Sequence, residues 1–274
     1  MELRILGPLG ADINGTSIVP TASKQRQILA LLALYPGRVI PTTTLMEEIW
    51  GDQLPRRAHT TMQTYILHLR RRLTHALGPD TPTTTAKQLL ATGHGGYLLH
   101  TTPQSVDVHE YNRLTTLGQH AFDQGHDEQA AHTLRHALTL WQGPALLDVR
   151  TGPVLTIETM RLEESRLVTL ERRIDADLRL GRHTQVLAEL TQLTAQHPHH
   201  EGLHSQAMVA HYRSGRQNTA LNTYHRLRHH LINELGIEPT PHLQRLHHAI
   251  LTVDPNLHIT AGPRHTSTFN LYAA

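Results

Sequence analysis

The chain has 274 residues with no cysteine and 24 histidines, which suits one or two domains and excludes disulfides, thiolate chemistry and cysteine zinc sites. Its formal net charge of +2 is unevenly spread: residues 1–100 carry ten lysines and arginines against six acidic residues, and the remainder carries fifteen against seventeen. The basic surface therefore belongs to the first part. Its expected partner is a polyanion rather than a membrane, because no long basic amphipathic helix with exposed aromatic residues accompanies it.

The N-terminal segment predicts two short strands joined by a turn. Residues 2–9 are typical of a strand, and the sequence Asp-Ile-Asn-Gly at residues 12–15 predicts a turn into a second strand around residues 17–19. The segment carries charges and lacks the apolar stretch of a signal peptide. The longest clean apolar run, residues 28–35, is too short to span a bilayer. We therefore expect a cytoplasmic protein.

Two helices are predicted next. Ser23 is a favourable N-cap for a helix over residues 24–35, which Pro-Gly at residues 36–37 should end. A second short helix is expected over residues 42–50, closed by Gly51.

The third predicted helix, residues 60–77, has an apolar face and a polar, basic face. At 3.6 residues per turn, one stripe is apolar, as in a helix packed on a core, and consists of Met62, Ile66, Leu69 and Leu73. The opposite stripe consists of Thr60, Thr64, His68, Arg71 and His75. This pattern favours a DNA-recognition helix, and a surface helix with a solvated basic end is the alternative.

A β-hairpin is predicted over residues 89–99, with a glycine-rich tip in which Gly95 and Gly96 should supply the positive φ of the turn. The order of strands, three helices and hairpin is typical of a winged helix-turn-helix, whose third helix enters the major groove of double-stranded DNA. The hairpin favours DNA binding over the alternative, because a solvated surface helix needs no wing.

The outward face of the third helix supplies the candidate base contacts, which are Thr60, Thr64, His68 and Arg71. Arginine suits the paired acceptors of guanine, and threonine suits a methyl group or an acceptor. The candidate phosphate contacts lie nearer the edges of this surface and are Lys24, Arg56, Arg57, Arg70 and Arg72. His94 and Tyr97 are the candidate wing contacts.

Residues 106–251 are almost wholly helical in pattern. Gly125, Gly181 and Gly215 each open a similar segment, and the last two are 34 positions apart, the period of a tetratricopeptide (TPR) repeat. We therefore expect a mainly α fold with a small β component. The predicted parts are a winged helix-turn-helix over residues 1–102, a TPR-like all-α domain over residues 103–257 and a disordered tail over residues 258–274.

Several motifs carry a family resemblance. Trp50-Gly51, the T-x-Q-x-Y-I-x-x-L-R-R-x-L pattern of residues 61–73 and the glycine-rich turn that ends at Tyr97 resemble response-regulator winged helices. More narrowly, they resemble the DNA-binding half of the Streptomyces antibiotic regulatory proteins. In the second half, the motifs that resemble the bacterial transcriptional activator domain of the same family are Leu-Trp-Gln-Gly-Pro-Ala-Leu at 140–146, Tyr-Arg-Ser-Gly-Arg at 212–216 and Glu-Leu-Gly-Ile-Glu-Pro at 234–239.

This resemblance implies a transcription activator of a secondary-metabolite, or antibiotic, gene cluster. Such an activator binds direct repeats near promoters, with one copy of the protein per helical turn, and recruits RNA polymerase. The resemblance assigns the loop of residues 52–58 to contact with the sigma factor or with the C-terminal domain of the polymerase α chain, and the second domain to pairing the copies on DNA. It implies no enzymatic activity and no cofactor.

Three other interpretations stay open. His200-Glu201-Gly202-Leu203-His204 has the spacing of a zinc hydrolase, but Gly202 interrupts the required helix and the histidine content makes chance matches easy, so we expect no metal site. A TPR-like protein-binding scaffold would show no salt-sensitive DNA binding. The same architecture could also repress transcription, and the histidines could make the second domain a pH or metal sensor.

Overall fold

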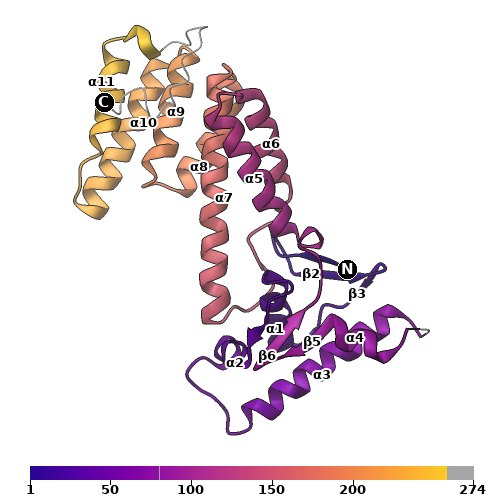
Figure 1. Ribbon diagram of the computed structural model, residues 1–274. Coiled ribbons are helices and arrows are strands. Elements are labelled where there is room, and N and C mark those ends of the chain that lie inside the picture. The colour runs from indigo at the N-terminus through magenta and orange to yellow at the C-terminus, as the bar shows by residue number, and fades with distance from the viewer. Residues whose placement is uncertain (80, 258–274) are drawn as a thin grey trace. The chain divides into compact units, whose positions relative to one another are not determined.

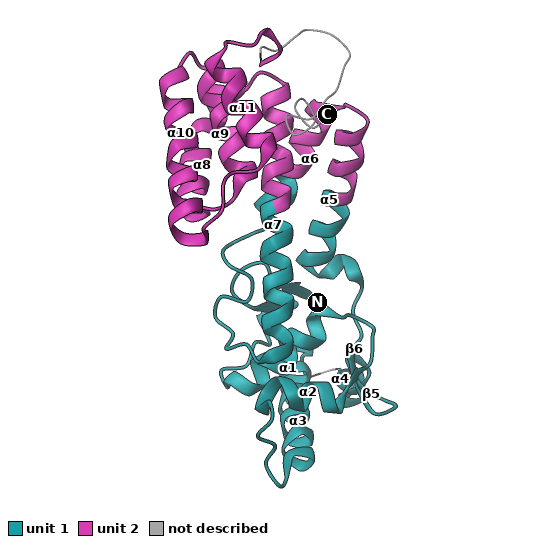
Figure 2. Ribbon diagram, turned by 90° about the vertical axis from the view of Figure 1, so that its left-hand side faces the viewer, with its two compact units in different colours: residues 1–115, 136–167 teal, residues 116–135, 168–274 magenta. Residues whose placement is uncertain are grey.

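A computed structural model describes residues 1–79 and 81–257, which form two compact units. Unit 1 comprises residues 1–115 and 136–167, and unit 2 comprises the described residues of 116–135 and 168–257, as coloured in Figure 2. Three helices contribute residues to both units: α5 (Asp107–Asp123), α6 (Asp127–Thr139) and α7 (Pro153–Arg179). No described helix is long and apolar enough to cross a membrane. The predicted tail lies outside the described residues.

Unit 1 begins with a three-stranded antiparallel sheet of β1 (Glu2–Arg4), β2 (Gly10–Ile13) and β3 (Thr16–Ser17). The strand predicted over residues 2–9 is therefore too long. The chain leaves the sheet after Arg4, and the carbonyl oxygens of Ile5 and Leu6 accept hydrogen bonds from the N–H groups of Leu146 and Gln142. The 140–146 motif thus pairs with the N-terminal segment.

The winged helix-turn-helix follows, and Figure 1 shows its elements in order. Its elements are α1 (Ser23–Leu34), β4 (Ile40–Pro41), α2 (Thr42–Trp50), α3 (Ala58–Leu77), α4 (Thr83–Leu89), β5 (Leu90–Gly93) and β6 (Gly96–Leu99). The hairpin strands join β4 in a second antiparallel sheet of order β4-β6-β5. The predicted fold of this part is confirmed.

Two local predictions in this part were wrong. Ser23 is the first residue of α1 rather than its cap, and Ala22, which precedes it, has no side chain that could cap the helix. The short helix α4 was not predicted, because threonine is a weak helix former. Tertiary packing decides here, since Ala86 of α4 is buried in the core of unit 1.

The predicted apolar stripe of α3 is confirmed: Met62, Ile66, Leu69 and Leu73 are all buried. They share one hydrophobic core with buried residues of α1 and α2. The same core includes Tyr111 of α5 and Trp141, whose rings meet edge to face at a centroid distance of 5.5 Å. The winged helix and the start of the second helical region therefore pack as one body.

Two buried carboxylates reinforce this body. Asp107, the first residue of α5, accepts hydrogen bonds from the backbone N–H groups of Ile5 and Leu6 at 2.8 and 2.9 Å. Glu48 of α2 accepts hydrogen bonds from the backbone around the start of α7. Burial raises the pKa of both carboxyl groups. Unit 1 thus contains residues on both sides of the predicted boundary at residues 102/103, and that boundary stays a prediction.

Unit 2 continues with α8 (His183–Gln196), α9 (Glu201–Arg213), α10 (Gln217–His230), a π-helical turn η2 (Leu231–Leu235) and α11 (Pro241–Leu251). Gly125, Gly181 and Gly215 lie in the turns between successive helices and have φ values of +74°, +77° and +74°. Glycine adopts this left-handed conformation readily, which explains its use at each turn. The predicted helical repeat is confirmed.

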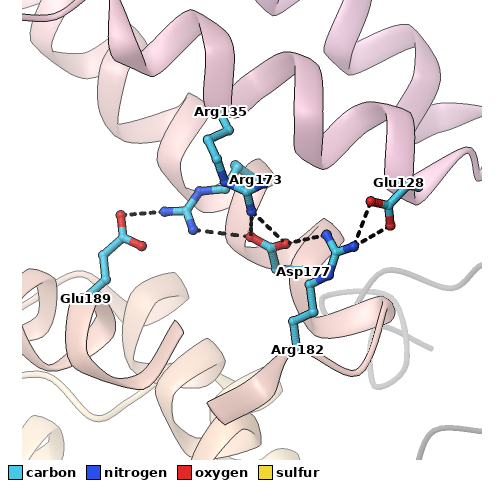
Figure 3. A network of polar contacts seen from close by, with 6 residues as sticks. All are labelled: Glu128, Arg135, Arg173, Asp177, Arg182 and Glu189. Atoms are coloured by element: carbon cyan, nitrogen blue, oxygen red, sulfur yellow. Dashed lines mark hydrogen bonds and ion pairs between the residues drawn. The ribbon is translucent and has the colours of Figure 1, made fainter. Parts of the chain in front are cut away.

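An ion-pair network holds part of unit 2 together (Figure 3). At its centre, Asp177 of α7 is only 1% exposed and accepts hydrogen bonds from Arg135, Arg173 and Arg182. Arg182 also pairs with Glu128 of α6, and Arg173 also pairs with Glu189 of α8. The network therefore links three helices through a single buried carboxylate.

Candidate nucleic-acid interface

The helix α3 presents a continuous exposed stripe along the face opposite the core. Residues three or four positions apart share one face of a helix, and the exposed members are Thr60, Gln63, Thr64, Leu67, Arg71 and His75. Leu67 is 47% exposed, which is unusual for a large apolar side chain on a helix with a well-buried face. Gln63 and Leu67 were missed in the sequence because the prediction searched for charged and threonine residues, although their spacing already placed them on this stripe.

Arg71 points away from the core without a protein partner. Its side chain is exposed and makes no hydrogen bond or ion pair with any residue in the described part of the chain. The planar guanidinium group therefore keeps all five N–H donors available for an outside acceptor. Thr64 uses its hydroxyl to donate to the carbonyl oxygen of Thr60 at 3.0 Å, which leaves its oxygen lone pairs and methyl group free.

His68 is only half-buried and is held by α1. Its Nδ1 lies 3.0 Å from the side-chain nitrogen Nε2 of Gln25. An amide nitrogen can only donate, so the neutral imidazole must accept at Nδ1 and carry its proton on Nε2. This contact fixes the tautomer of His68 and orients the ring.

Two of the predicted phosphate contacts support the fold instead. Arg70 donates from Nε to the carbonyl oxygen of Leu90 and from its guanidinium to the hydroxyl of Thr92, both at 2.9 Å. It thereby joins α3 to the first strand of the wing. Arg72 donates to the carbonyl oxygen of Val19 at 3.3 Å. Because these donors are occupied, the phosphate role suits these two arginines less well than was expected.

The remaining basic candidates are differently placed. Arg56 and Arg57 are exposed in the loop before α3 and make no ion pair within the described residues. Lys24 lies over the ring of Trp50, with its Nζ 5.0 Å from the ring centroid, and Trp50 stacks on Tyr65 of α3. Lys24 therefore braces the helix-turn-helix as well as supplying charge.

The wing places its two candidates in opposite environments. His94 is exposed at the tip of the hairpin, whereas Tyr97 is 8% exposed and belongs to the core of unit 1. This burial argues against a DNA contact by the Tyr97 ring. Gly95 has a φ of +74°, as predicted, but Gly96 does not have positive φ. Gly96 is required for space instead, because a Cβ there would collide with the carbonyl oxygen of Ile40 in β4.

The His-Glu-x-x-His motif divides into separate structural roles. His200 accepts the backbone N–H of Leu203 at the start of α9, and the carboxylate of Glu201 accepts the N–H and hydroxyl of Thr240 at 2.9 and 2.6 Å. His204 is buried inside unit 2. Within residues 1–79 and 81–257, no three histidine, cysteine or acidic residues are arranged to hold a metal ion. The motif's spacing therefore has another explanation.

Comparison with known proteins agrees with this geometry. The family described as "Transcriptional regulatory protein, C terminal" matches residues 15–99, and the family described as "Bacterial transcriptional activator domain" matches residues 106–251. Regulatory protein DnrI of Streptomyces peucetius is 50% identical over 257 residues, which cover 94% of each chain. Transcriptional regulator RedD of Streptomyces coelicolor is 35% identical, over 96% of this chain and 73% of its own.

The fold is also similar to a solved structure, that of Mycobacterium tuberculosis EmbR in complex with a low affinity phosphopeptide. The two superpose with a TM-score of 0.84 at 34% sequence identity, over 93% of this chain and 65% of that chain. The fold and the matches together define a winged-helix, DNA-binding transcription regulator, and not an enzyme. The chain belongs to the Streptomyces antibiotic regulatory protein family of transcriptional activators, which confirms the resemblance found in the sequence.

Proposed function

We propose that this activator binds direct repeats near the promoters of a secondary-metabolite, or antibiotic, gene cluster in the cytoplasm and recruits RNA polymerase there. The observation that carries the proposal is the exposed stripe of α3, with the unpartnered guanidinium of Arg71 near its centre. The 50% identity to Regulatory protein DnrI supports the link to this type of regulator.

The exposed stripe offers four different base-reading chemistries. Arg71 suits the paired acceptors of guanine, and Gln63 suits the donor and acceptor of adenine. Leu67 suits the methyl group of thymine, which is the one apolar feature on the base edges in the major groove. Thr64 and Thr60 complete the stripe, while Arg56 and Arg57 are placed to hold phosphates in preference to Arg70 and Arg72.

The loop of residues 52–58 is proposed to contact polymerase, through the sigma factor or the C-terminal domain of the polymerase α chain. Leu54 is exposed in this loop beside Arg56 and Arg57, so the loop presents an apolar side chain flanked by positive charge. If Arg56→Ala and Arg57→Ala abolish activation while DNA binding is intact, the loop contacts polymerase. If both activities are lost together, the two arginines hold phosphates.

Two copies are proposed to sit on adjacent repeats and to pair through the second domain. Copies that face the same side of the duplex must be about 10 to 11 base pairs apart, one helical turn. The phosphate contacts make the affinity fall as the salt concentration rises, because binding releases counterions from the DNA.

The test is a DNase footprint on the promoters around the protein's own gene at two salt concentrations. We expect protection of two adjacent repeats that weakens with salt. Arg71→Ala should weaken binding to the repeats, and Arg150→Ala, which removes an exposed arginine of unit 1 outside α3, should not. Leu67→Ala should weaken binding only where the operator has thymine under α3. Absence of protection at either salt, with polymerase added, would favour the protein-binding scaffold, and a reporter gene distinguishes activation from repression.

A further inference from the structure

Unit 2 contains a cavity of about 440 Å³ beside the helix α9. The helix α9 packs against both α8 and α10, and residues of all three helices line the cavity. A volume of this size lies within the range of small-molecule sites, about 300 to 1,000 Å³. The cavity therefore has room for a small ligand.

The lining of this cavity is rich in hydrogen-bond donors and contains no acidic side chain. Arg226 of α10 makes no ion pair or hydrogen bond within the described part of the chain. His204 of α9 is 5% exposed, and neither of its ring nitrogens makes a well-formed hydrogen bond, although the backbone of Pro198 lies close enough to favour the protonated ring slightly. The buried Nδ1 of His211 also has no partner among the described residues.

Burial and the positive charge of Arg226 act on these histidines. Burial is the larger cause and, with Arg226, lowers the pKa of His204 to about 4 and also lowers the pKa of His211. Both rings are therefore neutral near pH 7, and each carries one N–H that can be donated. Buried polar groups without partners are uncommon in folded proteins, since each has given up its hydrogen bonds to water without a replacement. Their convergence beside an unpaired guanidinium is what an acceptor-bearing ligand would satisfy.

We propose that this cavity binds a small organic anion, whose carboxylate or phosphate group lies between Arg226 and His204. The apolar part of the ligand would contact the side chains of Ala195, Pro198 and Ala207. A second cavity of about 590 Å³ is also lined by Arg226 and by His230, so the site continues along α10. His230 is already paired with Glu234 at 3.1 Å, which leaves Arg226 as the principal charge.

The cavity suits an anion better than a metal ion. The described residues hold no group of three or more potential ligands arranged around one point. The hydroxyls of Thr194 and Thr223 donate to backbone carbonyl oxygens, so the guanidinium and imidazole groups are the donors that remain for a ligand. This site is independent of the proposed DNA contacts, and it would give the regulator a small-molecule effector.

The test is calorimetric titration of the full chain with inorganic phosphate and, separately, with benzoate, at an ionic strength held constant with sodium chloride. We expect saturable binding of one equivalent of at least one probe. Binding of phosphate alone would identify a phosphate site, and binding of benzoate alone would identify a carboxylate site. Absence of saturable binding of both probes would overturn the proposal.

Matched variants locate the site. Arg226→Gln should weaken binding of the probe at least tenfold, and it should fold normally because Arg226 is exposed. Arg245→Gln, which removes another exposed arginine of unit 2, on α11, should leave the affinity unchanged. His204→Phe should also weaken binding, since it removes the buried donor while keeping a ring. Equal losses in Arg226→Gln and Arg245→Gln would show non-specific ion binding and would contradict the proposed site.

Discussion

The carboxylate of Glu48, in the last turns of α2, accepts a hydrogen bond from the backbone N–H of Gly152 at 2.5 Å. Its second oxygen accepts the N–H of Leu155 at 2.8 Å, and Glu48 is only 1% exposed. The N-terminal N–H groups of a helix have no partner within the helix, so Glu48 caps α7 from a distant part of the sequence. The helix-turn-helix is thereby fixed to the first half of α7 within unit 1.

Loss of this cap should destabilise unit 1. Glu48→Ala leaves two buried N–H groups without acceptors, and we expect the free energy of unfolding to fall by about 3 kcal/mol. Glu47→Ala removes an exposed carboxylate from the neighbouring position of the same helix and should change it by less than about 0.5 kcal/mol. Urea denaturation followed by circular dichroism measures both values, and equal effects in the two variants would refute the role of Glu48.

Arg70 and Arg71 are adjacent but should behave differently. Arg70→Ala removes the hydrogen bonds to Leu90 and Thr92, so it should lower the free energy of unfolding by about 1 to 2 kcal/mol and weaken binding to all DNA sequences. Arg71→Ala should leave stability unchanged and cost about 1 to 3 kcal/mol of binding free energy on the cognate operator only.

The measurement for this pair combines thermal denaturation with fluorescence-anisotropy titration of cognate and scrambled duplexes. An Arg71→Ala variant that lost affinity equally for both duplexes would hold a phosphate instead of reading a base. A stable Arg70→Ala variant would show that the wing does not need this arginine.

The ion-pair network of unit 2 should depend on its central carboxylate. Asp177→Ala leaves Arg135, Arg173 and Arg182 without their shared partner, and we expect a loss of about 3 to 5 kcal/mol in the free energy of unfolding. Glu128→Gln changes the most exposed acidic member of the same network and should cost at most about 1 kcal/mol. Chemical denaturation compares the two, and a smaller loss in Asp177→Ala than in Glu128→Gln would contradict a central role for Asp177.

His204 should make unit 2 sensitive to acid. Its pKa is lowered to about 4 in the folded chain from an ordinary value of 6.5, so the unfolded chain takes up the proton first as the pH falls. Its contribution to stability is therefore complete above pH 6.5 and is lost as the pH falls through about 4. At about 1.4 kcal/mol per pKa unit, the full loss is about 3 kcal/mol.

Urea denaturation between pH 7 and pH 4 tests this expectation. In His204→Leu the loss of stability over this range should be smaller by about 2 to 3 kcal/mol, because the titrating group is absent. His248→Leu, which replaces an exposed histidine of α11, should keep the full loss. Identical pH profiles in the wild type and His204→Leu would show that other groups cause the acid sensitivity.

The sequence alone determined the elements, the family and the class of function. Met62, Ile66, Leu69 and Leu73 could be assigned to the core because helical periodicity depends only on residue spacing, and the three glycines marked their turns because few other residues adopt positive φ. Motif order did the same for the family. Local chemistry of this kind needs no knowledge of distant contacts.

Only the tertiary structure decided which of the candidate side chains are free. Spacing placed Arg70, Arg71 and Arg72 in one turn as equivalents, but contacts with Leu90 and Val19 occupy two of them and leave Arg71 available. Burial of Tyr97 and exposure of Leu67 were likewise set by packing between segments far apart in the sequence. The same is true of Glu48 and Gly152, which are brought together by folding. Long-range contacts of this kind have no local signature, because the hydrogen-bond partner is chosen by the fold and not by the neighbouring residues.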